Sequence, residues 1–289
     1  MISAIVVARN EERNLDLALR SLRSWVDETI VIDQESTDRT AEIARSFGAR
    51  VIPHPVTGYA EPCRAFARDQ ARGDWILFVD ADEVVSRPLA EALIRCAAAS
   101  DVDAVRIPRR NHLLGAAVLH SGWNPSRDLC LRFFRRDAVI FPTTIHSHPR
   151  LRPETRVVDL PPDGEALLLH FHVRDVSQFV ERMDRYTTFE ARERHERGER
   201  ATPFASLRAA AREWLMRFVW HGGWKDGWRG FHLSMLMVSY RFVQQAKLAQ
   251  LTEIGDAAEA ERRDRAEAER WLAAYDAPGS SPAPGPGAR

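Results

Sequence analysis

Cysteine is scarce in this chain, with three in 289 residues, and no two lie at the close spacing of a zinc knuckle or a redox motif. A disulfide framework would need more cysteines, so we expect a reducing compartment. Net charge is also absent, because 41 basic and 41 acidic residues cancel, and we expect no nucleic-acid partner. No run of about 18 consecutive apolar residues predicts a membrane-spanning helix. The N-terminus lacks the basic start and cleavage site of a signal peptide, so we expect a cytoplasmic protein.

What the chain does contain is enough apolar sequence for a sizeable core, at 45% apolar and 28% charged residues. In the first hundred residues, short apolar runs typical of buried strands alternate with stretches of helical spacing. This alternation favours a parallel sheet with helices on both faces, which binds ligands beyond the carboxyl ends of its strands. The predicted strands cover 4–8, 29–32, 49–52 and 75–79, and the predicted helices 11–25, 36–47 and 63–71.

The rest of the chain changes character twice. From 101 to about 172 it is rich in predicted strands, and beyond 176 it becomes helical. A glycine- and tryptophan-rich hinge at 220–228 separates two of these helices. A charged, alanine-rich helix follows over 253–275, and we expect it to be solvated because its apolar spacing is weak.

Two carboxylates follow the fourth predicted strand directly. Asp80 ends that strand and Asp82 lies two residues on, while Asp33 ends an earlier strand. Carboxylate oxygens at this spacing can hold Mg²⁺ or Mn²⁺ and leave room for substrate phosphates. An isolated Asp-x-Asp is equally well explained as a solvated turn, so the interpretation depends on its context.

That context resembles a known family. The strings IVVARNE over 5–11, VIDQESTDRT over 31–40 and ARGDWILFVDADE over 71–83 resemble family 2 glycosyltransferases, which use nucleotide sugars. Within that family the chain is most similar to the lipopolysaccharide-core glucosyltransferase group, the WaaE-like enzymes. A looser similarity continues in later segments, namely 132–135, 145–148, 169–170 and 222–227.

The resemblance implies an α/β fold of the GT-A type, in which a Rossmann-like mixed sheet flanked by helices binds the nucleotide, here with a helical C-terminal extension. It implies that residues 1–100 form the nucleotide-sugar-binding half and 101–175 the acceptor-side half. We expect a helical, Trp- and Arg-rich extension over 176–251, the charged helix within 252–277 and a disordered tail over 278–289.

The resemblance also assigns roles to individual residues. Asn10, Glu11 and Asp33 are similar to residues that line the nucleoside, with Asp33 accepting from the uracil ring. Asp80 resembles the carboxylate on the ribose and metal side, and Asp82 the direct metal ligand. A Mn²⁺ or Mg²⁺ cofactor suits this chemistry, because a divalent cation neutralises the charge that develops on a departing nucleoside diphosphate.

Several of these residues have plainer explanations. Arg64 and Arg68, on the predicted helix before the acidic motif, can face the donor phosphates, but solvated helix arginines are equally expected. Asn10 and Glu11 also suit a helix start, with Asn10 as the cap and an acid in the first turn.

The sequence departs from the family pattern where a general base is expected. The family commonly has His-Glu at the position of His146 and Ser147, and a serine cannot take the proton from the acceptor hydroxyl. Asp128, His146 and His148 are the remaining candidates. An acceptor that is already an anion would need no base.

Two histidine pairs have the spacing that places both side chains on one face of a strand. They are His146 with His148, and His170 with His172. Either pair can converge on the metal site, although such pairs are more commonly core or surface residues.

The segment 201–250 is basic within a neutral chain. Seven basic residues and two acidic ones give it a formal charge of +5, and four tryptophans lie among them. This composition suits peripheral contact with the inner face of an anionic membrane. The alternative is that the segment packs on the catalytic domain or on a second subunit, so oligomerisation stays open.

The leading hypothesis is a metal-dependent, inverting glycosyltransferase. We expect it to move a hexose from a nucleotide sugar, UDP-linked as the resemblance implies, to a cell-surface glycan or lipid-linked acceptor such as lipopolysaccharide core. A phosphatase of the haloacid dehalogenase type would carry its Asp-x-Asp near the start of the chain, which 80–82 does not match. A nucleotidyltransferase on a related fold is a further alternative. Ser147 alone favours a non-catalytic, nucleotide-binding scaffold at the membrane.

Overall fold

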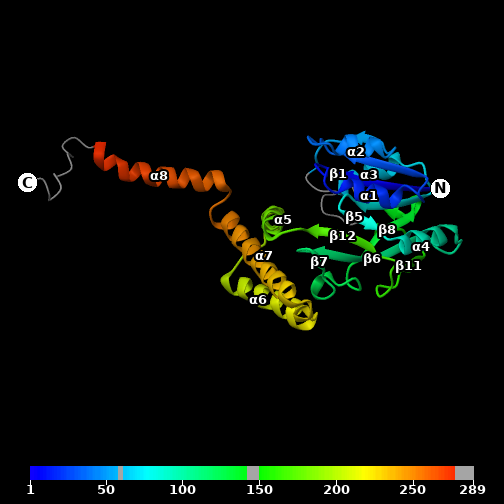
Figure 1. The fold of residues 1–289 in the computed structure, drawn as a ribbon. Coiled ribbons are helices and arrows are strands. Elements are labelled where there is room, and N and C mark those ends of the chain that lie inside the picture. The colour runs from blue at the N-terminus through cyan, green and yellow to red at the C-terminus, as the bar shows by residue number, and fades with distance from the viewer. Residues whose placement is uncertain (58–60, 142–149, 277–289) are drawn as a thin grey trace, which may run out of the picture. The chain divides into compact units, whose positions relative to one another are not determined.

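The computed structural model describes residues 1–57, 61–141 and 150–276 (Figure 1). These residues form two compact units. The first contains Met1–Gln178 and Arg217–Phe231, and the second contains Phe179–Met216 and His232–Arg289. The expected disordered tail over 278–289 lies outside the described residues.

The first unit is built on a mixed sheet whose strand order is β3-β2-β1-β4-β8-β6-β12-β5. Its first four strands are all parallel, as the alternation of strands and helices predicts. Two of them are buried over nearly their whole length, which is why their sequences are almost wholly apolar. These strands are β1 (Ile2–Ala8), β2 (Glu28–Asp33), β3 (Arg50–Pro53) and β4 (Trp75–Asp80).

The other strands make the sheet mixed. β8 is antiparallel to both β4 and β6, and β12 is parallel to β6 but antiparallel to β5. β7 and β11 pair with β6, and β9 and β10 form a separate pair. The bounds are β5 Glu83–Val85, β6 Ala104–Leu113, β7 Ala116–Ala117, β8 Leu129–Arg135, β9 Val139–Ile140, β10 Arg150–Leu151, β11 Val157–Asp159 and β12 Leu168–Val173.

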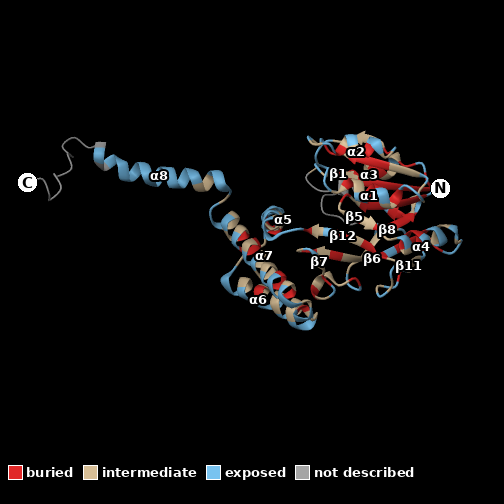
Figure 2. Ribbon diagram, viewed as in Figure 1, coloured by how far each residue is buried: buried red, intermediate tan, exposed pale blue. Residues whose placement is uncertain are grey.

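Helices cover both faces of this sheet. Successive side chains of a strand point to opposite faces. Val6 of β1 accordingly packs in one core cluster with Leu19 and Leu89, while the adjacent Ile5 packs in a second cluster with Cys63. Figure 2 shows the buried residues concentrated along the strands. The helices are α1 (Leu15–Leu22), α2 (Thr40–Ser46), α3 (Glu61–Gln70) and α4 (Arg87–Ala98).

The second unit is helical. Its helices include α5 (Val176–Glu196), α6 (Pro203–Trp214), α7 (Gly227–Glu253) and α8 (Ala257–Asp276), the first and third of which begin in the first unit. The carboxylate of Glu190 on α5 accepts from the Tyr240 hydroxyl of α7 at 2.7 Å, which ties those two helices together. α8 is almost wholly exposed, as its weak apolar spacing predicts. Among the described helices, none has the length and apolar content to cross a membrane.

Candidate active site

Two carboxylates lie at the carboxyl ends of the parallel strands, one on each side of β1. In the strand register, Val7 of β1 is opposite Asp80 of β4, and Ala8 is opposite Asp33 of β2. Asp33 and Asp80 therefore flank the end of β1, which is the edge where sheets of this kind bind ligands. Both residues are of intermediate exposure, so a ligand can reach them.

The segments that follow β1 and β2 are joined by hydrogen bonds. The Asn10 side-chain oxygen accepts from the Thr37 backbone N–H at 2.8 Å, and the Asn10 N–H donates to Ser36 Oγ at 3.0 Å. The Glu11 N–H donates to Thr40 Oγ1 at 2.8 Å. Asn10 has a φ of 55°, a left-handed conformation that asparagine tolerates better than most residues. These contacts fix the backbone beside Asp33.

The expectation that Asn10 caps the first helix is wrong. α1 begins at Leu15 and its N-cap is Asn14. Asn10 lies four residues upstream of this cap. Its side-chain oxygen accepts instead from the Thr37 N–H in the segment that follows β2. The polar run after β1 therefore shapes a loop at the strand ends.

Asp80 faces two guanidinium groups. Its Oδ1 lies 2.8 Å from Arg64 Nη2 and 3.2 Å from Arg132 Nη1, and Arg132 Nη2 contacts Oδ2. Burial alone would raise the pKa of Asp80, but the charges of Arg132 and Arg64 outweigh it and hold that pKa well below its usual range. Asp80 is therefore an anion whose two oxygens both accept from arginine. Arg64, predicted to face the donor, reaches this carboxylate.

A chain of buried charges extends from Asp80. The Glu83 side chain is fully buried, and it accepts from the Asp80 N–H at 2.8 Å and from Arg109 Nη1 at 3.1 Å. Arg109 also makes two hydrogen bonds to the Asp128 carboxylate, at 2.9 and 3.1 Å. Buried charges persist only when they are paired, so these groups are fixed relative to one another.

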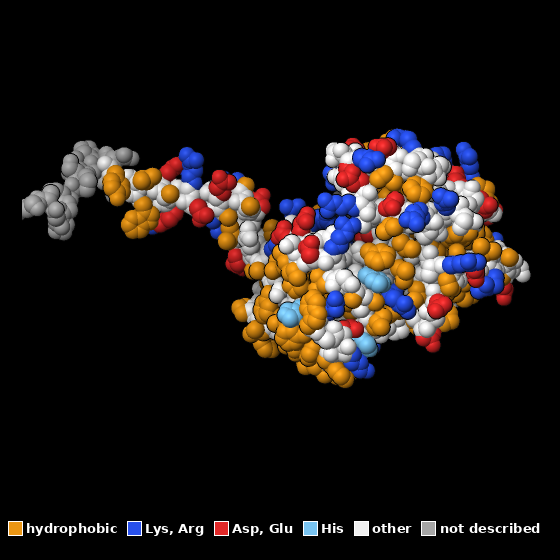
Figure 3. Space-filling model, in the orientation of Figure 1, with side chains coloured by type: hydrophobic (Ala, Val, Ile, Leu, Met, Phe, Trp, Pro, Cys, Tyr) orange, Lys and Arg blue, Asp and Glu red, His pale blue; other side chains and the backbone are white. Residues whose placement is uncertain are grey.

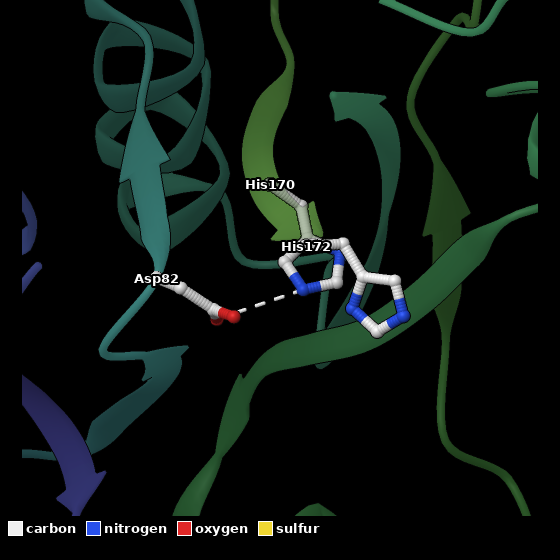
Figure 4. Close-up of side chains that lie close together, drawn as sticks. All are labelled: Asp82, His170 and His172. Carbon is white, nitrogen blue, oxygen red and sulfur yellow. Dashed lines mark ion pairs between the residues drawn. The ribbon is translucent and has the colours of Figure 1, made fainter. Parts of the chain in front are cut away.

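Asp82 points toward the imidazole of His170, and the imidazole of His172 lies beside that ring (Figure 4). Its Oδ1 lies 3.5 Å from His170 Nε2, and the rings of His170 and His172 have centroids 4.6 Å apart. One ligand atom from each of the three residues lies within 4.8 Å of the others. A carboxylate oxygen with two imidazole nitrogens is a donor set that fits a divalent transition metal ion.

Strand pairing brings these three residues together. β12 runs antiparallel to β5 with His170 opposite Glu83, and the Phe171 N–H donates to the Asp82 carbonyl oxygen at 2.9 Å. Because side chains alternate along a strand, His170 and His172 share a face and Phe171 points the other way. His170 and His172 thus lie on one face of β12 beside Asp82, as their spacing in the sequence predicts.

Asn111 of β6 sets the orientation of His170. The Asn111 side-chain oxygen lies 2.7 Å from His170 Nδ1, and its nitrogen donates to Asp128 Oδ2 at 2.7 Å. Ionised Asp128 can only accept, so the Asn111 amide must direct its NH₂ there and its oxygen toward His170. His170 then carries its proton on Nδ1, which leaves the Nε2 lone pair directed toward Asp82.

Of the three residues predicted as candidates for the general base, the structure describes one. His146 and His148 lie outside the described residues. Asp128 is described, and its two oxygens accept from Arg109 and Asn111. Burial alone would raise the pKa of Asp128, but the charge and hydrogen bonds of Arg109 outweigh it and lower that pKa. Arg68, the other helix arginine, pairs with Asp69 at 2.7 Å.

Sequence reasoning passed over three residues of this cluster: Arg109, Asn111 and Arg132. A usable signal existed for Arg132, which is a charged residue in the middle of the apolar run 129–134 and is buried. A charge in such a run requires a partner. Asn111 offers no comparable signal, because one asparagine in a strand is unremarkable until its neighbours are known.

Comparison with known proteins identifies a family to which the chain is similar. The model of the family described as Glycosyl transferase family 2 matches residues 3–152. The lipopolysaccharide core biosynthesis glycosyltransferase LpsC of Rhizobium meliloti (strain 1021) is 28% identical over 255 residues, covering 86% of this chain and 92% of LpsC. An uncharacterized glycosyltransferase of Rickettsia typhi is 27% identical over 263 residues, covering 87% of each chain.

Solved structures align over smaller parts of the chain. Residues 1–349 of S. aureus TarS, in complex with UDP-GlcNAc, are 24% identical with a TM-score of 0.35, covering 38% of this chain and 35% of that one. Glucosyl-3-phosphoglycerate synthase from Mycobacterium tuberculosis, in complex with Mn²⁺, UDP and glucosyl-3-phosphoglycerate, is 26% identical with a TM-score of 0.31. That alignment covers 39% of this chain and 44% of the synthase.

Proposed function

The chain belongs to glycosyl transferase family 2, and from that premise we propose that it moves a hexose from a UDP-linked sugar to a cell-surface glycan or lipid-linked acceptor. The family match and the names of its relatives make it a glycosyltransferase with the GT-A fold. LpsC, with 92% of its length covered, supports an acceptor of the lipopolysaccharide-core class. The single observation that carries the proposal is the convergence of Asp82, His170 and His172 beside the ends of the parallel strands.

The donor is assigned to the edge where β1, β2 and β4 end. Asp33 and Asp80 flank the end of β1 there, and the hydrogen bonds of Asn10 and Glu11 hold the adjoining backbone in place. We assign the nucleoside to Asn10, Glu11 and Asp33. Asp80 takes the ribose side, where it also positions Arg64 and Arg132.

The divalent cation is assigned to Asp82, His170 and His172. A bound cation would neutralise the charge that develops on the departing diphosphate. Mg²⁺ prefers oxygen ligands, so two imidazoles in the set favour Mn²⁺. Asp80 has its oxygens directed to guanidinium groups, and we propose that it supports the site through those arginines rather than by ligation.

The transfer itself requires attack by an acceptor hydroxyl on the anomeric carbon. The new glycosidic bond forms as the bond to the diphosphate oxygen breaks, which inverts the configuration at that carbon. The hydroxyl proton must pass to a base within hydrogen-bond reach. Asp128, His146 and His148 stay the predicted candidates. Asp128 has a second use in any case, because it orients Asn111 and through it His170.

Calorimetric titration of UDP and UDP-glucose, with and without Mn²⁺, tests this proposal. Binding that Mn²⁺ strengthens in the wild type, that Asp82→Ala abolishes and that Glu91→Ala preserves would support it. Glu91 is a suitable control because its side chain is 53% exposed on α4, where it pairs with Arg87. Equal Mn²⁺ dependence in Asp82→Ala would overturn the metal assignment, and binding of a different nucleotide alone would redirect the donor.

A scaffold without catalysis is the competing function, favoured by Ser147 in place of the family glutamate. It predicts nucleotide binding but no turnover. Release of UDP from UDP-glucose in the presence of truncated lipopolysaccharide, followed over hours, separates the two. Turnover that survives Ser147→Ala but disappears in Asp82→Ala would reject the scaffold.

A further inference from the structure

The segment 217–231, which we call the aromatic segment, exposes large apolar side chains. It connects α6 to α7 and belongs to the first unit. Figure 3 shows hydrophobic side chains gathered around the turn between these two helices. Contiguous exposed apolar surface of this kind is typical of an interaction site. The exposed fractions are Trp220 78%, Trp224 58%, Trp228 56%, Val219 54% and Phe231 43%.

This exposure does not come from a loose loop, because the aromatic segment is anchored by its single acid. The Asp226 carboxylate accepts from the Leu119 N–H at 3.2 Å, from the His120 N–H at 3.0 Å and from His120 Nδ1 at 2.9 Å. The Asp226 side chain is 9% exposed as a result. Asp226 therefore fixes the aromatic segment in place and contributes little negative charge to its surface.

Further hydrogen bonds hold the aromatic segment on either side of Asp226. The Ser121 N–H donates to the His221 carbonyl oxygen at 3.0 Å, and Arg229 Nε donates to the Leu114 carbonyl oxygen at 3.0 Å. Backbone-directed bonds of this type fix where the chain runs. The tryptophans are thus presented on a rigid support within the first unit.

Glycine is required at the turns between the tryptophans. Gly222 and Gly227 have φ values of +69° and +61°, in the left-handed region that glycine adopts at no steric cost. A Cβ on Gly230 would lie 1.8 Å from the Gly223 carbonyl oxygen, so the backbones there are in direct contact. The shape that exposes the aromatic rings is built into the backbone.

Positive charge accompanies the exposed rings. Lys225 Nζ lies 5.5 Å from the centre of the Trp224 ring, and the Arg229 guanidinium lies 4.7 Å from that of Trp228. With Asp226 directed inward, the outward charge of the aromatic segment is positive. Tryptophan next to lysine or arginine is the composition of surfaces that rest in the headgroup region of a bilayer.

We propose that the aromatic segment docks the enzyme on an anionic lipid bilayer. Trp220, Trp224 and Trp228 would enter the headgroup region, while Lys225 and Arg229 pair with lipid phosphates. This proposal narrows the membrane contact expected over 201–250 to fifteen residues of the first unit. It is independent of donor binding, because none of these residues belongs to the donor site.

Vesicle co-sedimentation of the full chain tests the proposal. We expect binding to vesicles of phosphatidylcholine and phosphatidylglycerol to be at least about tenfold stronger than to phosphatidylcholine alone, and to weaken in high salt. Trp224→Ala and Lys225→Glu should each reduce it about tenfold. UDP affinity and the melting temperature should stay unchanged in both variants, since neither residue is in the donor site or the core.

Trp271→Ala supplies the matched control. Trp271 on α8 is 67% exposed, but its indole donates to Glu267 at 2.8 Å, and Glu267 also pairs with Arg270, so the charges beside this ring balance. This variant should bind vesicles as the wild type does. Equal binding to neutral and anionic vesicles, or unchanged binding in Trp224→Ala and Lys225→Glu, would overturn the proposal. So would a dimer in sedimentation equilibrium that Trp224→Ala dissociates, because a second copy would then occupy the aromatic segment.

Discussion

Soluble proteins usually bury apolar side chains and expose charged ones. The chain of buried charges that runs from Asp80 through Glu83 and the aromatic segment depart from this rule in opposite ways. The cluster around Glu83 buries charges, while the segment 217–231 exposes tryptophan. Buried charges cost desolvation energy and exposed aromatic surface forgoes burial. Each is also held rigidly by hydrogen bonds. Departures of this kind are expected where function rather than stability decides the residues, one site suited to a charged donor and the other to a lipid surface.

The largest expected effect concerns the cation site. Asp82→Ala should reduce kcat/KM of the transferase about a thousandfold, because stabilisation of the departing diphosphate is worth several kcal/mol. Removing divalent ions with a chelator should have the same effect on the wild type, and added Mn²⁺ should restore it. Steady-state kinetics checks this. An Asp82→Ala enzyme that stays fully active with Mn²⁺ would contradict the role of Asp82 in binding the cation.

The next largest effect concerns the stability of the fold when one of the buried ion pairs is broken. Arg132→Met leaves Asp80 and Glu83 short of a partner, and we expect a loss of about 3–5 kcal/mol in the free energy of unfolding. Arg87→Met is the matched control, because Arg87 is 91% exposed in its pair with Glu91 and such pairs contribute about 0–1 kcal/mol. Urea denaturation measures both. Equal losses would mean that burial does not distinguish the two pairs.

A smaller effect concerns Asn111, which we expect to position His170 for binding the cation. Asn111→Leu removes the acceptor that holds His170 in its Nδ1-protonated form, and Mn²⁺ affinity should fall about 10–100-fold. Titration of Mn²⁺ by electron paramagnetic resonance gives the affinity, and ¹⁵N chemical shifts of the imidazole report which nitrogen carries the proton. A loss of affinity with His170 still protonated on Nδ1 would contradict the positioning role.

The smallest effect concerns an ion pair near the surface. Hydrogen bonds from Arg156 lower the pKa of Asp103 to about 2. Because the folded value lies below the unfolded value near 3.9, the pair stabilises fully above about pH 4 and loses this contribution as the pH falls toward 2. Asp103→Asn should therefore cost at most about 1 kcal/mol at pH 6 and nothing below pH 2. A constant difference across that range would contradict the assignment.

The parallel half of the sheet could be predicted from the sequence because its signals are local. Apolar runs at 4–8, 29–32, 49–52 and 75–79 became β1 to β4, and Asp33 and Asp80 followed at their ends. Each strand is identified by its own residues and its flanking turns. The parallel register then follows from the alternation with helices.

The approach of His170 and His172 to Asp82 could not be predicted with the same certainty, since it depends on pairing between distant segments. His170 reaches Asp82 only because β12 pairs with β5 across more than eighty residues of chain. A shift of one residue in that register would turn His170 and His172 to the other face. The sequence offered two histidine pairs that can converge on the metal site, but it could not show that His170 and His172 reach Asp82.

Helix ends were also beyond local reasoning. The boundary between two of the helices was expected at the hinge over 220–228, whereas α6 already ends at Trp214, a π-helix follows over Leu215–Trp220 and α7 begins at Gly227. A π-helix of this kind inserts a residue into the helical turn without a distinctive sequence. The aromatic segment owes its geometry to contacts with 114–121, which no local pattern reports.

Anomalous diffraction from crystals grown with Mn²⁺ and UDP would locate the cation itself. We expect one strong manganese peak about 2.0–2.3 Å from a carboxylate oxygen of Asp82 and from imidazole nitrogens of His170 and His172, with UDP phosphates beside it. Asp80 should keep its contacts with Arg64 and Arg132. A peak ligated by Asp80 with neither histidine in contact, or UDP bound with no manganese nearby, would contradict the account.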